Sequence, residues 1–579
     1  MQSIYIDSSV PEKTAKNRFC FPEFIMMENA AVALETEVRS ALKNISFSEK
    51  PEAVLILCGT GNNGGDGYAL ARRLCGFLPV KIFSVGEPKT QEAAGQKLMA
   101  VSCGVEVTES VEETLSELKN FSGVIVDCLY GTGFHGSLNE TAEKLLAAAN
   151  ESAAYKIACD IPSGLDRNGV ISCAGQGKKL AFCADLTVTM GALKAALFSD
   201  AAKNFCGKIV TADLGITSEK FCECAEPDAF LLERNDIKLP VRTKKSAHKG
   251  DFGHAAVIMG EKAGAGVIAG TAALSFGAGL VTEVDSGLCK ANFMMSPELM
   301  VSDSLPERTS AVLLGSGLGR SEKSFAVAEN VIKKVFEMKN PSVVLDADFF
   351  YYEKLKEVLE RLNSIPGARV ILTPHPKELH ELLLRTSVVC FALFESTRST
   401  TGMNYAVNEP NTAVIEPVET TDATTEICSS VPEALEGSKS LKDMGSELCC
   451  TEGRASRGEI TFADVCDRRF EYARLFAKKY SNLVLVCKGA NTYICAGENS
   501  FVCDCGSVAL AKAGSGDVLA GLCTALLAQG YSAEDAAKTA VYAHAEASCN
   551  FERNYECTPL GLAERLGKMQ GEEMKSWNA

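Results

Sequence analysis

One local pattern recurs along this sequence: a short apolar run, a turn rich in glycine, and a stretch with helical spacing of apolar residues. In its first instance, the apolar residues 53–58 precede the glycine-rich residues 59–67 and the helical pattern of residues 68–74. Runs that are apolar throughout are typical of parallel strands buried on both faces of a sheet. Strand, turn and helix together form a βα unit, so the recurrence predicts an α/β protein.

Length and composition favour a multidomain protein that acts on small molecules. A chain of 579 residues predicts about two to four domains, because one core rarely organises so many residues. The net charge of −16 argues against nucleic acid and anionic membranes as partners, and no apolar run approaches the roughly 20 residues of a membrane helix. The 24 cysteines show no disulfide framework, so we expect a reduced, cytoplasmic protein.

Polar residues follow three predicted strands of the first half, namely Asn63, Asp127, and Asp160 with Ser163. Because ligands of open α/β sheets bind at the carboxyl edge of the strands, one pocket could collect all four side chains. The glycines near Asn63 lack the usual setting of the dinucleotide-binding fingerprint. Amide and carboxylate oxygens suggest sugar hydroxyls or a hard cation as ligands. Each residue alone is also explained as a loop cap.

Taken together, these segments resemble the NAD(P)H-hydrate epimerase family over residues 20–220. The resemblance is carried by residues 61–67, by Asp127 with residues 131–134, and by residues 160–164. It implies a Rossmann-like three-layer fold and interconversion of the R and S forms of hydrated NAD(P)H. The substrate-binding residues that it implies are Asn62, Asn63, Gly64, Gly65, Asp66, Gly131, Thr132, Gly133, Phe134, His135, Gly136, Ser137 and Asp160.

The same resemblance implies that Asp160 is catalytic and that a potassium ion is held by Asn63, Asp127 and Ser163. Ligation by oxygen atoms alone suits a hard cation.

A loop of small residues in the second half combines an anion-binding backbone with a carboxylate. Residues 511–517 run into an apolar helical pattern, and the free N–H groups of a first helical turn bind anions. Asp517 would repel a phosphate, which favours a role as a base or metal partner. An N-cap without catalytic function is the alternative. His375 lies between two prolines, and such a rigid turn favours a site role.

The second half resembles the ADP/ATP-dependent NAD(P)H-hydrate dehydratase family, which is similar in fold to ribokinase-like kinases. The segments that carry the resemblance are, in order, residues 249–253, 315–319, 346–348, 373–378, 488–490 and 514–517. It implies a hydrate pocket lined by Ala265, Gly317, His375 and Asp517, with Asp517 as the catalytic carboxylate. It implies that the nucleotide, ADP or ATP with magnesium, is held by Lys488, Gly489, Ala490, Gly514, Ser515 and Gly516.

Elementary chemistry agrees with this assignment. Hydroxide is a poor leaving group from the reduced ring, so transfer of a phosphoryl group to the hydroxyl lowers the barrier to elimination. Asp517 would deprotonate the hydroxyl while the amides of residues 514–516 stabilise the phosphoryl charge. The whole chain is therefore predicted to epimerise the R and S hydrates, NADHX and NADPHX, and to dehydrate the S form at the expense of ADP or ATP.

Two other functions fit parts of the pattern. A ribokinase-like kinase of a small alcohol, fused to a ligand-binding Rossmann-like domain, would share Asp517 and the anion-binding loop but release the phosphoester. A first half that only binds ligands or partners is disfavoured, because it retains Asp127 and Asp160.

We place the domain boundary near residue 225, which gives an epimerase domain of residues 1–225 and a dehydratase domain of residues 226–579. Residues 386–460 are rich in Thr, Ser and Glu and have no periodicity, so they predict a disordered insertion. We also expect a homo-oligomer.

Overall fold

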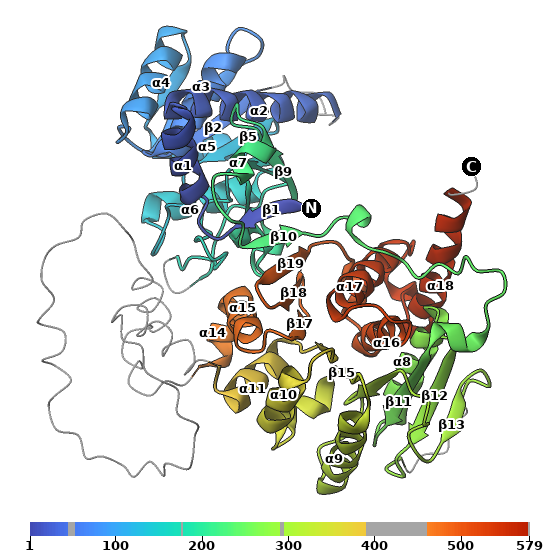
Figure 1. Cartoon of the computed structure of the whole chain (residues 1–579). Coiled ribbons are helices and arrows are strands. Elements are labelled where there is room, and N and C mark those ends of the chain that lie inside the picture. The colour runs from blue at the N-terminus through green and yellow to red at the C-terminus, as the bar shows by residue number, and fades with distance from the viewer. Residues whose placement is uncertain (45–52, 175–177, 290–294, 389–459, 577–579) are drawn as a thin grey trace, which may run out of the picture.

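The computed structural model describes residues 1–44, 53–174, 178–289, 295–388 and 460–576 (Figure 1). Most of the insertion predicted at residues 386–460 lies outside these residues. Among the residues described, none of the helices combines the length and the apolar character needed to cross a membrane.

Seven parallel strands form the first sheet, in the order β4-β3-β2-β5-β6-β7-β9. They are β2 (Val54–Cys58), β3 (Val80–Ser84), β4 (Glu106–Thr108), β5 (Val124–Cys128), β6 (Tyr155–Cys159), β7 (Leu186–Met190) and β9 (Lys208–Ala212). Numbered along the chain, the order is 3-2-1-4-5-6-7, which is the Rossmann arrangement with one added strand. The direction of winding reverses between β2 and β5, and ligands bind at such a switch point.

Helices cover both faces of this sheet, which makes the three layers that were expected. The helices are α1 (Ser9–Phe19), α2 (Glu23–Asn44), α3 (Asn62–Leu74), α4 (Gln91–Ser102), α5 (Val111–Leu118), α6 (Glu140–Glu151) and α7 (Ser218–Cys222). The position of β2 between two layers of helices explains why its sequence is apolar throughout. Val54 and Ile56 enter the core under α2 and α3, while Leu55 and Leu57 enter the core under α6.

The second sheet has twelve strands, in the order β13-β12-β11-β14-β15-β16-β17-β18-β19-β10-β1-β8. In sequence they are β1 (Gln2–Tyr5), β8 (Leu193–Lys194), β10 (Ala229–Leu231), β11 (His254–Met259), β12 (Leu280–Asp285), β13 (Met300–Ser302), β14 (Ala311–Leu314), β15 (Ser342–Leu345), β16 (Arg369–Leu372), β17 (Leu483–Cys487), β18 (Thr492–Ala496) and β19 (Asn499–Cys503). From β13 to β17 the strands are parallel and again wound 3-2-1-4-5-6-7, with a switch point between β11 and β14.

Helices also cover both faces of the second sheet. They are α8 (Ala263–Ser275), α9 (Glu322–Glu337), α10 (Leu355–Ser364), α11 (Pro376–Thr386), α14 (Phe462–Asp467), α15 (Arg469–Lys479), α16 (Ser515–Ala528), α17 (Ala533–Cys549) and α18 (Pro559–Ser576). Short 3-10 helices are η2 (Ala195–Phe198), η3 (Ala202–Asn204), η4 (Arg234–Asp236), η5 (Lys249–Phe252), η6 (Ala347–Tyr351), η7 (Val508–Leu510) and η8 (Asn554–Glu556). Residues 462–479 form two helices, α14 and α15, because Arg468 leaves helical geometry at φ −125°.

Three short strands carry the second sheet across to the first domain. Strand β1 pairs antiparallel with β10 and parallel with β8, and β10 pairs parallel with β19. Figure 1 shows β1 and β10 at the junction of the two domains, next to β19. The boundary near residue 225 remains a prediction, but the first residues of the chain belong to the sheet of the second domain.

Candidate active sites

The first site lies at the switch point between β2 and β5. Helix α3 begins at Asn62, only four residues after β2 ends. The turn between them is tight, since a methyl group at Gly59 would lie 1.9 Å from the carbonyl oxygen of Leu129 and one at Gly64 would lie 2.0 Å from that of Gly59. Glycine is therefore required here by the close approach of the backbone. The turn presents Asn62 and Asn63 at the carboxyl edge of the sheet.

Asp127 and Ser163 form a buried pair at this edge. The Ser163 hydroxyl donates to Oδ1 of Asp127 at 2.7 Å, and the Ser163 amide donates to Oδ2 at 2.8 Å. Burial raises the pKa of Asp127 to about 6, and its hydrogen bonds from Ser163 and from the amide of Leu129 oppose that rise. The structure thus brings together two of the four residues that were expected to share one pocket.

Asn63 and Asp160 lie on either side of Gly131. A methyl group at Gly131 would be 3.2 Å from Oδ2 of Asp160 and 3.6 Å from Cγ of Asn63. Both polar atoms of the Asn63 amide are buried and have no hydrogen-bond partner among the residues that the structure describes. A buried amide without partners costs free energy, which indicates that this side chain faces a ligand.

Lys194 is a residue of this site that the sequence analysis missed. Its side chain is 1% exposed, and its ammonium lies 2.8 Å from Oδ1 of Asp160. It also donates to the carbonyl oxygens of Met190 and Ala192. Asp160 has a left-handed backbone, φ +73°, an uncommon conformation for a residue other than glycine. A lysine within the apolar stretch around β8 was the available signal, because a buried charge requires a partner.

Two further carboxyl groups lie near Asp160 and Lys194. Burial raises the pKa of Glu12, on α1, to about 7, with the charge of Lys194 opposing the rise and that of Asp160 adding to it. Burial and the charges of Asp160 and Glu12 raise the pKa of Asp66 well above its usual value. The site therefore holds more carboxyl groups than it can ionise together.

The remaining predicted residues of this site form an exposed loop beside it. Thr132 donates its backbone N–H to Oδ2 of Asp160 at 3.4 Å. Phe134 stacks on Tyr130 with ring centroids 4.7 Å apart. Gly133, His135, Gly136 and Ser137 are exposed. The exposed residues of this loop are thus available to a ligand, while Phe134 packs against the core.

The second site lies at the switch point between β11 and β14. Ala265, in the first turn of α8, and Gly317, after β14, are in contact, since a methyl group at Gly317 would lie 2.8 Å from Cβ of Ala265. Lys262 donates its amide to the carbonyl oxygen of Gly317 at 2.9 Å. The structure therefore brings together two residues predicted to line the hydrate pocket.

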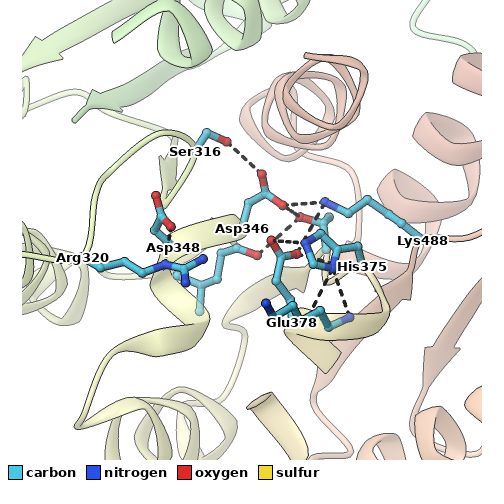
Figure 2. A network of polar contacts seen from close by, with 10 residues as sticks. Ser316, Arg320, Asp346, Asp348, His375, Glu378 and Lys488 are labelled. Carbon is cyan, nitrogen blue, oxygen red and sulfur yellow. Dashed lines mark hydrogen bonds and ion pairs between the residues drawn. The ribbon is translucent and has the colours of Figure 1, made fainter. Parts of the chain in front are cut away.

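Asp346, at the end of β15, is the centre of a polar network (Figure 2). Its Oδ2 accepts a hydrogen bond from Ser316 at 2.9 Å, and its Oδ1 accepts one from Thr373 at 2.7 Å. The ammonium of Lys488, after β17, lies 2.9 Å from Oδ1. Burial lowers the pKa of Lys488, but the charges of Asp346 and Glu378 raise it further than burial lowers it.

His375 and Glu378 cap the start of α11. Nδ1 of His375 accepts the amides of Lys377 and Glu378, and Glu378 in turn accepts the amide of His375 at 2.9 Å. Nε2 of His375 lies 3.0 Å from Oε1 of Glu378. Because Nδ1 is an acceptor here, Nε2 carries the ring proton. Figure 2 shows this capped turn beside Lys488 and Asp346.

The glycine loop that precedes α16 completes the second site. Gly514 has φ +92° and is the N-cap of the helix, and a methyl group at Gly516 would lie 3.4 Å from Nζ of Lys488. The buried imidazole of His544 fixes the loop through the carbonyl oxygen of Ser515 at 3.0 Å. Burial lowers the pKa of His544 to about 4, so that side chain is neutral.

Asp517 lies in the first turn of α16, beside this network. Burial, followed by the charge of Asp346, raises its pKa to about 7, while Lys488 and a hydrogen bond from Ser316 oppose the rise. Gly514 rather than Asp517 is the N-cap, so capping does not explain the acid. A carboxyl group whose pKa lies near 7 is suited to accept a proton at neutral pH.

Comparison with known proteins finds relatives of both halves of the chain. A family model described as YjeF-related protein N-terminus matches residues 23–196, and one described as NAD(P)H-hydrate dehydratase matches residues 255–424 and 459–568. The bifunctional NAD(P)H-hydrate repair enzyme of Helicobacter pylori is 37% identical over 570 residues, which are 98% of this chain and 100% of that protein. The chain belongs to the family of bifunctional NAD(P)H-hydrate repair enzymes.

Other relatives of the same description are more distant. The repair enzyme of Coxiella burnetii is 34% identical over 58% of this chain and 67% of its own length. Among solved structures, an ADP/ATP-dependent NAD(P)H-hydrate dehydratase from Bacillus subtilis, co-crystallised with ATP and Mg²⁺, is 19% identical with a TM-score of 0.39, and covers 60% of this chain and 99% of that one.

Membership in the repair family confirms the predicted fold class, a Rossmann-like domain followed by a ribokinase-like one, and the predicted function of bifunctional NAD(P)H-hydrate repair by an epimerase and a dehydratase. It favours the repair enzyme over the small-alcohol kinase and over a first domain without activity. The individual site residues remain predictions. Asp346 and Glu378 are further candidates for the second site, since each follows a buried strand at the same edge of the sheet as the predicted site residues.

Proposed function

We propose that each switch point is one active site of the repair enzyme. The site between β2 and β5 epimerises the R and S hydrates of NADH and NADPH, and the site between β11 and β14 dehydrates the S form with ADP or ATP. The observation that carries the second assignment is the position of Asp517. A carboxyl group with a pKa of about 7 stands at an anion-binding helix start and beside the ammonium of Lys488.

In the dehydratase, Asp517 accepts the proton of the hydrate hydroxyl. The freed oxygen attacks the terminal phosphoryl group of ADP or ATP, and the shortened nucleotide leaves with the electron pair of the broken P–O bond. The phosphate ester then leaves as inorganic phosphate, with loss of a proton from the adjacent ring carbon, and NADH or NADPH results. The amides of Gly514, Ser515 and Gly516 stabilise the charge of the transferred group.

We give the remaining roles in this site to residues near Asp517. Ala265, Gly317 and His375 line the hydrate pocket, and Lys488, Gly489 and Ala490 contact the nucleotide phosphates. The carboxylates of Asp346 and Glu378, both buried, are oxygen donors of the kind that magnesium prefers. Magnesium bound with the nucleotide would neutralise phosphate charge.

In the epimerase, the hydrate is held by residues 62–66 and by the loop of residues 131–137, with Asp160 at the reacting ring. Asn63, Asp127 and Ser163 fit a potassium ion, because all three offer oxygen atoms and the Asn63 amide has no partner in the described part of the chain. Potassium would supply a fixed positive charge that orients the substrate. Lys194 holds the Asp160 carboxylate in place.

The test follows reduced-nicotinamide absorbance while the full-length protein acts on a mixture of R and S NADH hydrates with magnesium and ADP or ATP. We expect all of the NADH to return, faster than spontaneous epimerisation allows. Asp517→Ala is expected to recover no NADH yet still to epimerise the hydrates, and Asp160→Ala is expected to stop after the S fraction. Release of a stable phosphoester instead of NADH would establish the kinase.

A cytoplasmic location and a homo-oligomer complete the proposal. The described cysteines are free thiols, which supports a reducing compartment. Light scattering of the purified protein would give the oligomeric state.

A further inference from the structure

The turn between β17 and β18, residues 488–491, is the segment to which the proposed function assigns nucleotide binding. Gly489 and Ala490 are exposed, whereas Asn491 is 1% exposed. The turn therefore offers its tip to a ligand and is anchored at its base. Residues of both domains anchor the base.

Arg469, the first residue of α15, lies against this turn from inside the protein. Its side chain is 3% exposed. It donates to the carbonyl oxygen of Lys488 at 2.7 Å and to that of Asn491 at 2.5 Å. A methyl group at Gly489 would lie 1.6 Å from a guanidinium nitrogen, so the glycine makes room for the arginine. One planar guanidinium thus fixes both ends of the turn, which a lysine ammonium could not do with the same geometry.

The acid that pairs with Arg469 belongs to the first domain. Oδ1 of Asp200 lies 2.8 Å from the Arg469 guanidinium and also accepts the amide of Asn491 at 3.2 Å. Asp200 follows η2, which itself follows directly on β8 and Lys194. The residue that neutralises the buried arginine is therefore only six positions from a residue of the first active site.

Asn491 is held almost entirely by the first domain. Its Nδ2 donates to the carbonyl oxygen of Phe198 at 2.8 Å, and Lys203 donates to its Oδ1 at 2.6 Å. Its amide bonds Asp200 and its carbonyl oxygen bonds Arg469. All four polar groups of Asn491 are thus satisfied by Arg469 and by residues of the 198–203 segment.

We infer that Asp200 and Arg469 are positioning residues of the dehydratase, and that the epimerase domain thereby sets the affinity of the other domain for its nucleotide. The inference rests on the proposed assignment of residues 488–490 to the nucleotide. Without Asp200, the buried cation of Arg469 loses its counter-charge and the backbone amide of Asn491 loses its acceptor. The turn then samples other conformations, and the nucleotide binds only to the correct one.

A second ion pair of helix α15 provides a matched control. Arg474 lies on the same helix, 2.8 Å from Oδ1 of Asp228, and Asp228 likewise accepts one backbone amide, that of Ile6, at 2.8 Å. Asp200→Ala and Asp228→Ala therefore each remove one ion pair with α15 and one backbone acceptor. Only the first of them touches the turn of residues 488–491.

The experiment compares these two variants as full-length proteins in steady-state dehydration and in hydrogen–deuterium exchange. For Asp200→Ala we expect the KM for ADP or ATP to rise about tenfold or more, with the epimerase rate unchanged and with faster exchange in residues 489–492. Asp228→Ala should do neither. Asp200→Asn, which keeps an oxygen acceptor, should raise the nucleotide KM less, and Arg469→Lys should raise it as Asp200→Ala does.

Failure of this inference is distinguishable from failure of the proposed function. Unchanged exchange in Asp200→Ala, or faster exchange with a nucleotide KM equal to that of Asp228→Ala, overturns the positioning role. Lys488→Met tests the assignment of the turn itself. If that variant raises the nucleotide KM while Asp200→Ala does not, the assignment stands and only the positioning role fails.

Discussion

Asp517 combines partial burial with a neighbouring negative charge, and this combination fixes the pH at which it can act. Its pKa is raised to about 7 by burial and by Asp346, so the carboxyl group is protonated at lower pH and cannot accept a proton there. We expect kcat/KM of dehydration to rise as pH increases through about 7 and to level off above, because only the carboxylate is a base. The measurement is the rate of NADH formation from the S hydrate across this range.

The control for this pH profile is a variant that keeps the shape of the site but lacks the carboxyl group that titrates. Asp517→Asn should lower the rate by about 10²–10⁴-fold, the usual contribution of a general base, and its remaining activity should not vary with pH through about 7. Epimerisation by the same variant should match that of the intact protein. A profile of the intact protein that is flat between about pH 6 and 8 would contradict the role of Asp517.

Lys194 and Asp160 give a second prediction at the scale of single residues. Lys194→Met removes the cation from a buried pair and leaves the carboxyl groups of Asp160, Asp66 and Glu12 together. We expect the free energy of unfolding to fall by about 3–5 kcal/mol, as when one partner of a buried pair is removed, and epimerisation to be lost. Denaturant unfolding and the recovery of NADH from the R hydrate measure the two effects.

The double variant Lys194→Met with Asp160→Asn separates stability from catalysis. Because it removes both charges of the pair, it should recover much of the stability lost by Lys194→Met. It should still fail to epimerise. Epimerisation restored along with stability would show that neither the Asp160 carboxylate nor Lys194 is needed for catalysis.

At the scale of elements, β12 contains a buried acid that no function in either site uses. Glu283 is fully buried, and within the described ranges neither of its carboxyl oxygens has a hydrogen-bond partner. It lies under α8, since a methyl group at Gly270 would be 2.0 Å from Oε1 and one at Gly266 would be 3.1 Å from Oε2. The small residues of α8 thus make room for a carboxyl group between helix and sheet.

Burial of Glu283 predicts a loss of stability as pH rises. Its pKa is raised to about 8 by burial, while in the unfolded chain it is near the usual value of about 4.3. Between these values unfolding releases a proton, so the free energy of unfolding falls with pH by about 1.4 kcal/mol per unit. Denaturant unfolding of Glu283→Gln should lack this contribution. A difference between variant and intact protein that does not change from pH 5 to 8 would contradict the prediction.

The elements also show which features the sequence could predict. Apolar strands followed by glycine turns, such as β2 with the start of α3, can be predicted from local residues alone. The position of these turns at one edge of the sheet can also be predicted, because parallel strands present their carboxyl ends together. β1 and β8 are only four and two residues long, too short for periodicity to indicate a strand. The contact between Lys194 and Asp160 depends on the pairing of β8 with β1, and for that reason the sequence did not reveal it.

The same limit applies to helix α15 and its first residue. Helices α14 and α15 are separated at Arg468, which leaves helical geometry. Arg469 begins the second helix in a position that bonds Asp200, far away in the sequence. Contacts of this kind between domains leave no local pattern.

At the scale of the whole molecule, two domains with the same strand order are joined through the second sheet, which takes up β1 and β8 from the first domain. The first residues of the chain supply the strand that joins them, with Ile4 opposite Ala229 of β10 and Leu193 of β8. Ile4 is fully buried. A sheet that runs through both domains couples their unfolding, because disrupting either side exposes the same strand.

This coupling predicts that a single substitution in β1 changes how the molecule unfolds. Ile4→Asp places a charge in a core position at a cost of several kcal/mol and should separate β8 from β10. We expect calorimetry to show one transition for the intact protein and two for the variant, with faster proteolysis near residues 216–245. Val10→Asp, at a position on α1 that is 50% exposed, introduces the same charge without touching the sheet and should leave one transition. If Ile4→Asp lowers the melting temperature but keeps a single transition, β1 contributes to stability without joining the two domains.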